Sequence, residues 1–188
     1  MNDNYTAFSK TAKYYHDHRP TYPSEVIDIL TNQYELHPHS IIADIGSGTG
    51  IFSQLFLEHG NTVYAIEPNT EMRQIAEQHF SKQPHFKSIN ATAEKTTLPD
   101  HCVDFVCAAQ AFHWFDPTMC KKEFRRIMTK NGKLVLIWNR PLFKRNHLMQ
   151  SFGALLKKYR LENMEDRHQY RSSADILRFF DNSKAEDY

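Results

Sequence analysis

The sequence predicts an α/β protein with a doubly wound, mainly parallel sheet and helices on both faces. From Ile41 onward, short apolar runs alternate with amphipathic stretches, as expected for strands joined by crossover helices. The apolar runs show little polar alternation, which is typical of strands buried on both faces. A glycine-rich turn directly follows the first run, at the position where open parallel sheets bind ligands.

Each element can be assigned from its local pattern. Strands are expected at Ile41–Ile45, Thr62–Ile66, Phe86–Ile89, Val103–Ala109 and residues 133–138. Helices are expected at Ile51–His59, at residues 71–80 after Asn69 as N-cap, and at residues 117–129 after Asp116 as N-cap. Asn131 and Gly132 are expected to end the last of these helices.

The segments on either side of this core differ from it in composition. Residues 1–40 are polar and aromatic and predict a helical cap, in which Pro23 opens a helix. The expected buried side of that helix consists of Val26, Ile27, Ile29 and Leu30. Residues 41–140 form the expected ligand-binding core. Residues 141–188 predict helices at 148–161 and 175–180, so we expect one domain in three parts.

Composition excludes several classes of function. The chain has 188 residues, which suits one domain, and its formal charge of +1 lacks the basic excess of most nucleic-acid binders. No apolar run approaches the roughly 18 residues of a membrane span, and the first residues lack a secretory pattern. The three cysteines lack metal-ligand spacing, so a reduced, cytoplasmic setting is expected. We therefore expect no nucleic-acid or membrane partner.

The segment that indicates a ligand-binding site is the turn Gly46-x-Gly48-x-Gly50, between the first strand and the helix that follows it. Glycines there permit a tight turn and a close approach of ligand to backbone, and the helix offers free amides. The next strand ends at Glu67, 21 residues after Gly46, near the separation expected for a carboxylate that binds a ribose diol. A glycine-rich turn without ligand would leave Glu67 unexplained.

Two ligand classes share this arrangement. A nicotinamide dinucleotide site prefers G-x-G-x-x-G/A, in which the third small residue lets helix and strand pack closely. Here that third position is Ile51, and the glycines follow G-x-G-x-G instead. The pattern therefore favours a compact zwitterionic nucleoside and disfavours, without excluding, a nicotinamide-dependent oxidoreductase.

Several segments resemble the class I S-adenosylmethionine (SAM)-dependent methyltransferases, which have a Rossmann-like fold. Residues 44–50 (DIGSGTG) resemble the family's first motif, and residues 65–69 (AIEPN) its ribose-binding strand. Residues 93–99, 103–106 and 132–136 resemble the adenine edge, the fourth strand and the fifth strand. The resemblance is closest to the small-molecule group called methyltransferase type 11. Two further motifs, at 15–23 and 110–116, are similar to a trans-aconitate-methyltransferase-like subgroup.

This resemblance implies roles for individual residues toward SAM. Gly46 and Gly48 contact its methionine and ribose portions, Asp44 orients the loop or reaches the amino group, and Glu67 holds the ribose. Ala93 and Glu94 flank the adenine, whereas Gln110 faces the methionine end. Arg19 covers the pocket and neutralises the methionine carboxylate, unless it forms a surface ion pair. The expected cofactor-binding residues are Arg19, Asp44, Gly46, Ser47, Gly48, Gly50, Glu67, Pro68, Ala93, Glu94 and Gln110.

Methyl transfer from a sulfonium needs mainly position and electrostatics from the protein. A general base is needed only if the methyl acceptor must lose a proton, and His113 is the candidate. Alternatively, His113 and Trp114 shape the acceptor pocket. Tyr15 and Tyr22 line the acceptor side or pack within the cap. No metal is expected, because neither His16-x-His18 nor His37-x-His39 has a third ligand nearby.

The carboxyl end departs from this family, whose members continue into an antiparallel strand pair beside the fifth strand. No such pair is readable after residue 140, so we expect either a truncated chain or a fifth strand whose edge is covered by the helices at 148–180 or by a partner. The fifth strand would then lie at an open sheet edge, which could pair with a second copy in a dimer. A domain that binds SAM but is catalytically incompetent at this length is therefore an alternative to an active small-molecule methyltransferase.

Overall fold

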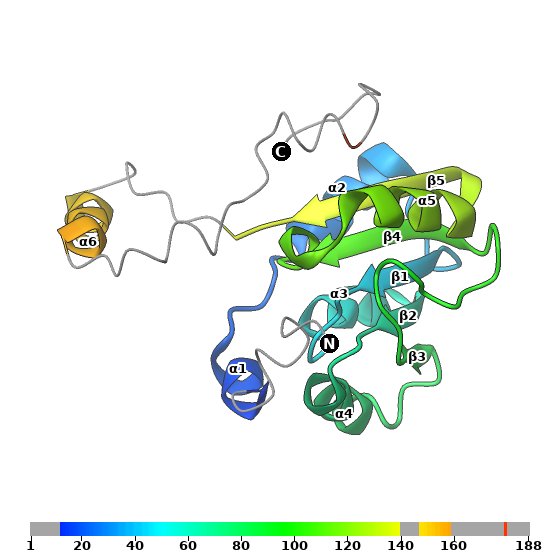
Figure 1. Cartoon of the computed structure of the whole chain (residues 1–188), viewed down its shortest axis with the longest axis horizontal. Coiled ribbons are helices and arrows are strands. Elements are labelled where there is room, and N and C mark those ends of the chain that lie inside the picture. The colour runs from blue at the N-terminus through cyan, green and yellow to red at the C-terminus, as the bar shows by residue number, and fades with distance from the viewer. Residues whose placement is uncertain (1–11, 140–146, 159–178, 180–188) are drawn as a thin grey trace. The chain divides into compact units, whose positions relative to one another are not determined.

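A five-stranded sheet organises the first of two compact units, Met1–Ile137 and Trp138–Tyr188. The computed structural model describes residues 12–139, 147–158 and 179. The strands are β1 (Ile41–Ile45), β2 (Thr62–Ile66), β3 (Phe86–Ile89), β4 (Val103–Ala109) and β5 (Met128–Ile137). They lie in the order β3-β2-β1-β4-β5, and every neighbouring pair is parallel. This arrangement confirms the predicted doubly wound α/β fold (Figure 1).

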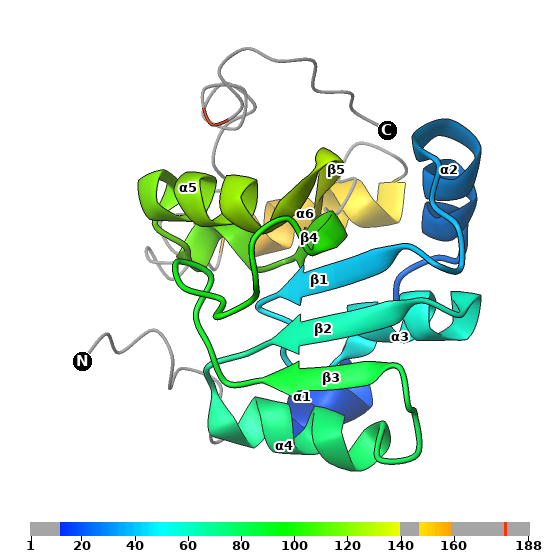
Figure 2. The ribbon, with the colours of Figure 1, turned by 90° about the vertical axis from the view of Figure 1, so that its right-hand side faces the viewer.

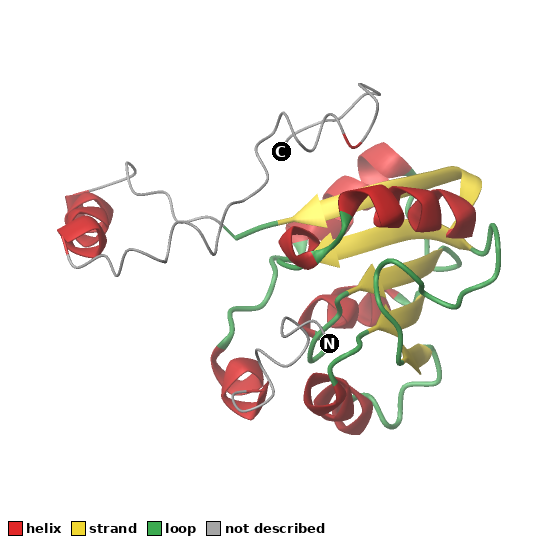
Figure 3. Ribbon diagram, viewed as in Figure 1, coloured by secondary structure: helices red, strands yellow, loops and turns green. Residues whose placement is uncertain are grey.

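Helices connect and cover the strands. They are α1 (Ala12–His18), α2 (Glu25–Tyr34), α3 (Ile51–His59), α4 (Thr70–His79), the 3-10 turn η3 (Phe112–Trp114) and α5 (Pro117–Ile127). Helix α3 packs against β1 and β2, α4 against β3, and α1 against α4. Figure 3 shows these helices in red around the yellow sheet. None of the described helices combines the length and the apolar composition of a membrane-crossing segment.

The core lies between α3 and the strands. Phe52 and Phe56 on α3 meet Ile42, Val63 and Phe105 of the sheet, and all five are at most 3% exposed. Burial of this much aromatic and aliphatic surface is the main favourable term in folding. It holds α3 against β1, and so it also holds the glycine turn that joins them.

The predicted helix caps are present. The Asn69 side chain accepts a hydrogen bond from Met72 N at 2.9 Å, at the start of α4. Asp116 Oδ1 accepts from Thr118 N and Met119 N at 2.8 and 2.9 Å, at the start of α5. These bonds satisfy amides of the first helical turn that have no partner within the helix.

Two predicted boundaries are wrong. Helix α5 ends at Ile127, and β5 begins at Met128 and runs through Asn131 and Gly132, which do not act as a stop. The reason is pairing with β4: Met128 aligns with Val103, and the register then shifts along β5 before regular pairing resumes. Helix α2 begins at Glu25, after a turn in which the Pro23 carbonyl accepts from Val26 N at 3.2 Å.

The strand order places a topological switch point between β1 and β4. From β1 the chain proceeds to β2 and β3 on one side and then returns to β4 on the other. The loops that leave β1 and β4 therefore diverge, which opens a crevice at the carboxyl ends of these strands. Figure 2 shows the arrowheads of β1, β2 and β3 pointing to one common edge.

Strand β5 lies at an edge of the sheet, and within the described ranges no antiparallel strand pair follows it. In the second unit, α6 (His147–Lys158) is present where residues 148–161 were expected to be helical. The helix expected at 175–180 lies outside the described residues, apart from Phe179.

Candidate functional site

The glycine turn after β1 is held against the end of β2. The Ile66 carbonyl accepts from Gly46 N at 2.8 Å and from Ser47 N at 3.2 Å. Gly46 has a φ of +68°, a conformation that strongly favours glycine. A Cβ at this position would lie 2.7 Å from the Ala111 Cβ, too close for two carbon atoms. The residue must therefore be glycine, because the turn approaches the segment after β4 so closely.

Asp44 lies beneath this turn, at the buried end of β1. It is 1% exposed, and its Oδ2 accepts a hydrogen bond from Ser53 Oγ at 2.6 Å. Its other oxygen, Oδ1, is buried and has no hydrogen-bond partner among the described residues. Desolvation by burial raises the pKa of Asp44 to about 7; the Ser53 hydrogen bond opposes this shift, and the nearby Glu67 charge adds to it. Asp44 therefore offers a buried acceptor for a polar or cationic ligand group.

Glu67 reaches the glycine turn from the end of β2. Its Oε2 accepts from Gly48 N and its Oε1 from Asn69 N, both at 2.8 Å. Burial raises the pKa of Glu67, and these two backbone bonds partly offset the effect. A carboxylate oxygen can accept more than one hydrogen bond, so each can still accept a ligand hydroxyl. The geometry suits a vicinal diol placed against the glycine turn.

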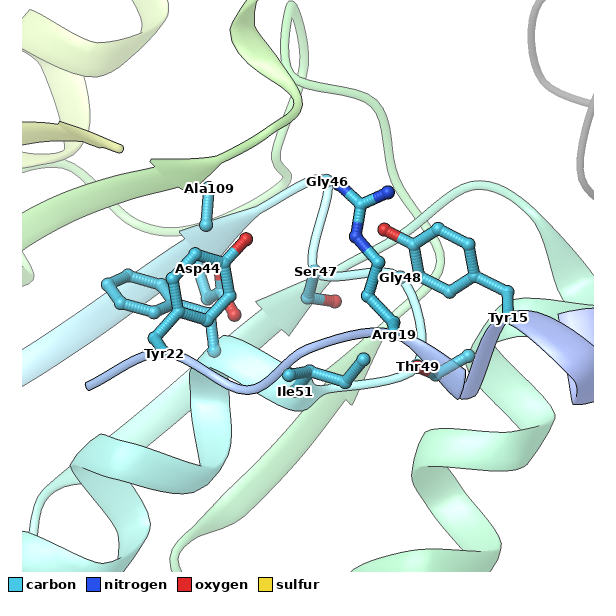
Figure 4. Close-up of a pocket in the computed structure, with 11 residues that line it drawn as sticks. Tyr15, Arg19, Tyr22, Asp44, Gly46, Ser47, Gly48, Thr49, Ile51 and Ala109 are labelled. Carbon is cyan, nitrogen blue, oxygen red and sulfur yellow. The ribbon is translucent and has the colours of Figure 1, made fainter. Parts of the chain in front are cut away.

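A pocket opens at the switch point, beside the glycine turn (Figure 4). Its lining includes predicted site residues from two parts of the sequence, the N-terminal segment and the β1 turn: Tyr15, Arg19, Tyr22, Asp44, Gly46, Ser47 and Gly48. Four lining residues were not predicted from the sequence: Thr49, Ile51, Phe52 and Ala109. The positions of Thr49 and Ile51 within and beside the glycine turn are a signal that could have identified them. Ala109 could have been found only from the strand order, because it ends β4.

Several polar atoms in or beside the pocket lack partners. Thr49 Oγ1 and Asp44 Oδ1 are buried and unpaired among the described residues, and both residues line the pocket. Buried polar groups in native proteins are nearly always hydrogen-bonded, and unpaired ones often mark a ligand site. The donors and acceptors present thus fit a ligand that carries both amino-acid and ribose groups.

The N-terminal segment forms one wall of the pocket. Tyr22 is 8% exposed and packs edge-on against Phe52, with ring centroids 4.9 Å apart. Burial raises the pKa of Tyr22, and the neighbouring Tyr15 and Asp44 raise it further. The pKa of Tyr15 is also raised, mainly by burial. Both phenols therefore stay protonated near neutral pH and can donate hydrogen bonds.

Other predicted site residues do not line this pocket. Glu94 Oε1 accepts from Asp116 N at 3.0 Å, which ties the loop after β3 to the start of α5. Gln110 follows β4 with a φ of +56°, and its Nε2 is buried without a partner among the described residues. His113 and Trp114 lie in η3, with ring centroids 4.9 Å apart. The remaining predicted residues outside the lining are Gly50, Glu67, Pro68 and Ala93.

The next feature is the arrangement of possible metal-ligating side chains among the described residues. No group of three or more His, Cys, Asp or Glu side chains is arranged there to hold a metal ion. The imidazole of His37 instead bonds Ser40 Oγ at 3.2 Å, and His18 bonds the Tyr14 carbonyl at 3.0 Å. These histidines are used in local hydrogen bonding.

The chain matches a known protein family. Residues 43–136 match Methyltransf_11, the family described as a methyltransferase domain. An uncharacterised methyltransferase of Mycobacterium tuberculosis is 34% identical over 133 residues, which cover 71% of this chain and 52% of the relative. An uncharacterised methyltransferase-like protein of Schizosaccharomyces pombe is 34% identical over 122 residues, 64% of this chain and 46% of the relative. The chain thus spans about half the length of these curated relatives.

Solved structures share the fold. A provisionally assigned SAM-dependent methyltransferase of Methanococcus maripaludis superposes with a TM-score of 0.66 at 20% identity, covering 95% of this chain and 80% of its own. A provisionally assigned methyltransferase of an antibiotic biosynthesis pathway, from Anabaena variabilis, gives 0.64 at 29% identity, covering 84% and 60%. The first likeness, at 20% identity, concerns the fold alone.

Proposed function

The chain belongs to the type 11 methyltransferase domains, within the class I SAM-dependent methyltransferases, and we propose that it transfers a methyl group from SAM to a small-molecule acceptor. The observation that carries this proposal is the contact between Glu67 and the glycine turn. Glu67 Oε2 accepts from Gly48 N at 2.8 Å, so a buried carboxylate and a glycine turn face one ligand position. That combination suits a nucleoside without phosphates.

Each part of the donor has a group to hold it. Glu67 accepts the ribose hydroxyls, with Pro68 beside it, and the backbone of Gly46, Ser47 and Gly48 lies along the ribose and methionine portions. Asp44 Oδ1, buried and unpaired among the described residues, accepts from the methionine amino group. We further assign to the donor site the helix-capping Gly50, Ala93 and Glu94 at the adenine, and Gln110 at the methionine end.

Bound SAM supplies an electrophilic methyl group on a sulfonium and a neutral thioether leaving group. The contribution of this chain is to fix the donor against the switch point and to keep water from it. Such positioning is worth roughly 7–11 kcal/mol of the barrier in well-oriented systems. The walls formed by Tyr15 and Tyr22 place two neutral phenols beside the donor, at the border with the acceptor.

The acceptor side is assigned to His113 and Trp114, which follow β4 on η3. His113 is the candidate base for an acceptor that loses a proton. Replacement by alanine should lower turnover more than SAM affinity, as measured by labelled methyl transfer and calorimetry. Equal turnover would leave His113 only a packing role.

We propose that the protein is cytoplasmic. We also propose that the edge of β5 pairs with a second copy of the chain. All three cysteines, Cys102, Cys107 and Cys120, are free, as expected in a reducing compartment. A small-molecule acceptor is favoured over nucleic acid by the formal charge of +1. A domain that binds SAM without catalysis is the second candidate, because the chain spans about half of its curated relatives.

Calorimetry tests whether the site binds a SAM-like ligand and not NAD. S-adenosylhomocysteine should bind and NAD should not; binding of NAD alone would contradict the proposal. Glu67→Ala should weaken binding by about 1–3 kcal/mol, the scale of a buried charge-assisted pair. Glu58→Ala, an exposed carboxylate on α3, is the matched control. A screen of metabolites with labelled SAM then distinguishes an active enzyme from a binding domain.

A further inference from the structure

Tyr15 and Arg19 form a stacked pair at the end of α1, and both line the pocket. The Arg19 Cζ lies 4.9 Å from the centroid of the Tyr15 ring. A separation of four residues places the two side chains on one side of the helix. Arg19 N donates to the Tyr15 carbonyl at 3.0 Å, the last bond of the helical ladder, and Pro20 then ends the helix.

Arg19 keeps its charge available. Within the described ranges Arg19 forms no ion pair, whereas Arg73, Arg126 and Lys133 are among the side chains that do. Figure 4 shows its guanidinium extending from the N-terminal segment toward the glycine turn, with the Tyr15 ring alongside. An unpaired guanidinium in a pocket is suited to an anionic group of a ligand, because its planar donors match a carboxylate.

The segment that carries the pair is anchored at both ends. On one side, α1 packs on α4, where the rings of His16 and His79 meet edge-on with centroids 5.3 Å apart. On the other side, Tyr22 is buried against Phe52 at the start of α3. The Tyr15 ring is therefore held relative to the glycine turn, and the flexible arginine side chain is what remains to be oriented.

We propose that Tyr15 is a positioning residue, whose ring holds the Arg19 guanidinium over the glycine turn so that it binds the carboxylate of the donor's amino-acid portion. The inference rests on the proposed function, because it requires a donor that carries a carboxylate. Stacking on an aromatic face attracts the cation and restricts its rotamers before the ligand arrives, so less freedom is lost on binding. The role predicted for Tyr15 toward the acceptor is thereby replaced by one toward the donor.

Two ligands that differ in the amino-acid portion test this role. S-adenosylhomocysteine carries the carboxylate, whereas 5′-methylthioadenosine keeps the nucleoside and thioether and lacks it. Tyr15→Leu should weaken S-adenosylhomocysteine binding about 3- to 30-fold and should leave 5′-methylthioadenosine binding within about twofold. Arg19→Met should show the same selectivity. The double variant should be no weaker than Arg19→Met alone, because the ring acts through the guanidinium.

Two further variants supply the controls. Tyr15→Phe keeps the aromatic face and should retain both affinities. Tyr14→Leu changes the neighbouring tyrosine of α1, which is 67% exposed and stacks on His18, and should change neither. Circular dichroism and thermal unfolding establish that each variant is folded.

The outcomes separate the inference from the proposed function. If the unaltered protein fails to bind S-adenosylhomocysteine, the proposed function fails and the inference with it. If it binds, but Tyr15→Leu weakens both ligands equally or neither, only the positioning role is overturned. The same follows if Tyr15→Phe behaves as Tyr15→Leu does, because the hydroxyl and not the aromatic face would then be responsible.

Discussion

Replacing Asp44 by asparagine should stabilise the protein increasingly as the pH rises. Asp44 is 1% exposed, and burial raises its pKa from 3.8 to about 7. Asparagine has nearly the same shape, does not ionise, and can still accept the hydrogen bond from Ser53 Oγ, which is 2.6 Å long in the unaltered protein. The substitution therefore removes the cost of a buried negative charge with little change in packing.

The direction of this pH dependence follows from the number of protons that the native and unfolded states bind. Between about pH 4 and pH 7 the native state keeps the Asp44 proton, whereas the unfolded chain has released it. The native state then binds more protons, so the free energy of unfolding falls as the pH rises through this window. A pKa difference of about three units, at 1.36 kcal/mol per unit, corresponds to about 4 kcal/mol above pH 7. About 3 kcal/mol of this change lies between pH 5 and pH 8.

Urea denaturation at pH 5, 6, 7 and 8 measures the effect. The gain in stability of Asp44→Asn over the unaltered protein should grow by about 3 kcal/mol from pH 5 to pH 8. Asp28→Asn, an exposed carboxyl on α2, controls for the loss of one charge. Ser53→Ala should shift the window upward, because the Ser53 hydroxyl lowers the Asp44 pKa. Parallel pH profiles for Asp44→Asn and the unaltered protein would refute the reasoning.

Three further substitutions test the surrounding structure by urea denaturation. Gly46→Ala should lower the free energy of unfolding by roughly 2–4 kcal/mol, because the backbone has a φ of +68° and the new Cβ would lie 2.7 Å from that of Ala111. An unchanged urea midpoint would contradict this expectation. Burial raises the pKa of Glu123, but hydrogen bonds from Arg126 and Thr96 outweigh it and lower the pKa to about 2. Glu123→Gln should therefore lower the free energy of unfolding by about 1–3 kcal/mol at pH 7. The difference between the variant and the unaltered protein should shrink as the pH falls toward 2, and a difference that does not change with pH would contradict this expectation. Asp116→Ala should cost about 1 kcal/mol through the lost α5 cap, whereas Asp116→Asn should cost less.

The elements predicted correctly from the sequence depend on local signals. The bounds of β1, β2, β3 and β4 match the expected ranges, because each is a short apolar run ended by turn residues. The caps Asn69 and Asp116 were found because their side chains act on amides two or three residues away. Strand β5 was placed too late, because its start depends on pairing with Val103 of β4, which lies 25 residues earlier.

The candidate donor site likewise contains residues that local spacing predicts and residues that it does not predict. Gly46, Gly48 and Glu67 follow from one strand–turn–helix unit and the next strand, so their spacing was sufficient to predict them, whereas Asp44 was predicted from the family resemblance. No spacing rule connects Ala109 to this turn, because the contact arises only from the strand order. Pocket residues drawn from separate parts of the sequence were therefore found by resemblance or missed.

For Tyr15, the role proposed from the structure differs from the role expected from the sequence. It was expected in the site, but on the acceptor side; it lines the pocket beside Gly48 and stacks with Arg19. The groups expected on the acceptor side, His113 and Trp114, lie outside that lining, in η3. Under the proposed function, donor recognition draws on the N-terminal segment and the β1 turn. The substitutions Tyr15→Leu and Arg19→Met should then alter donor affinity, and changes at His113 and Trp114 should alter acceptor selectivity.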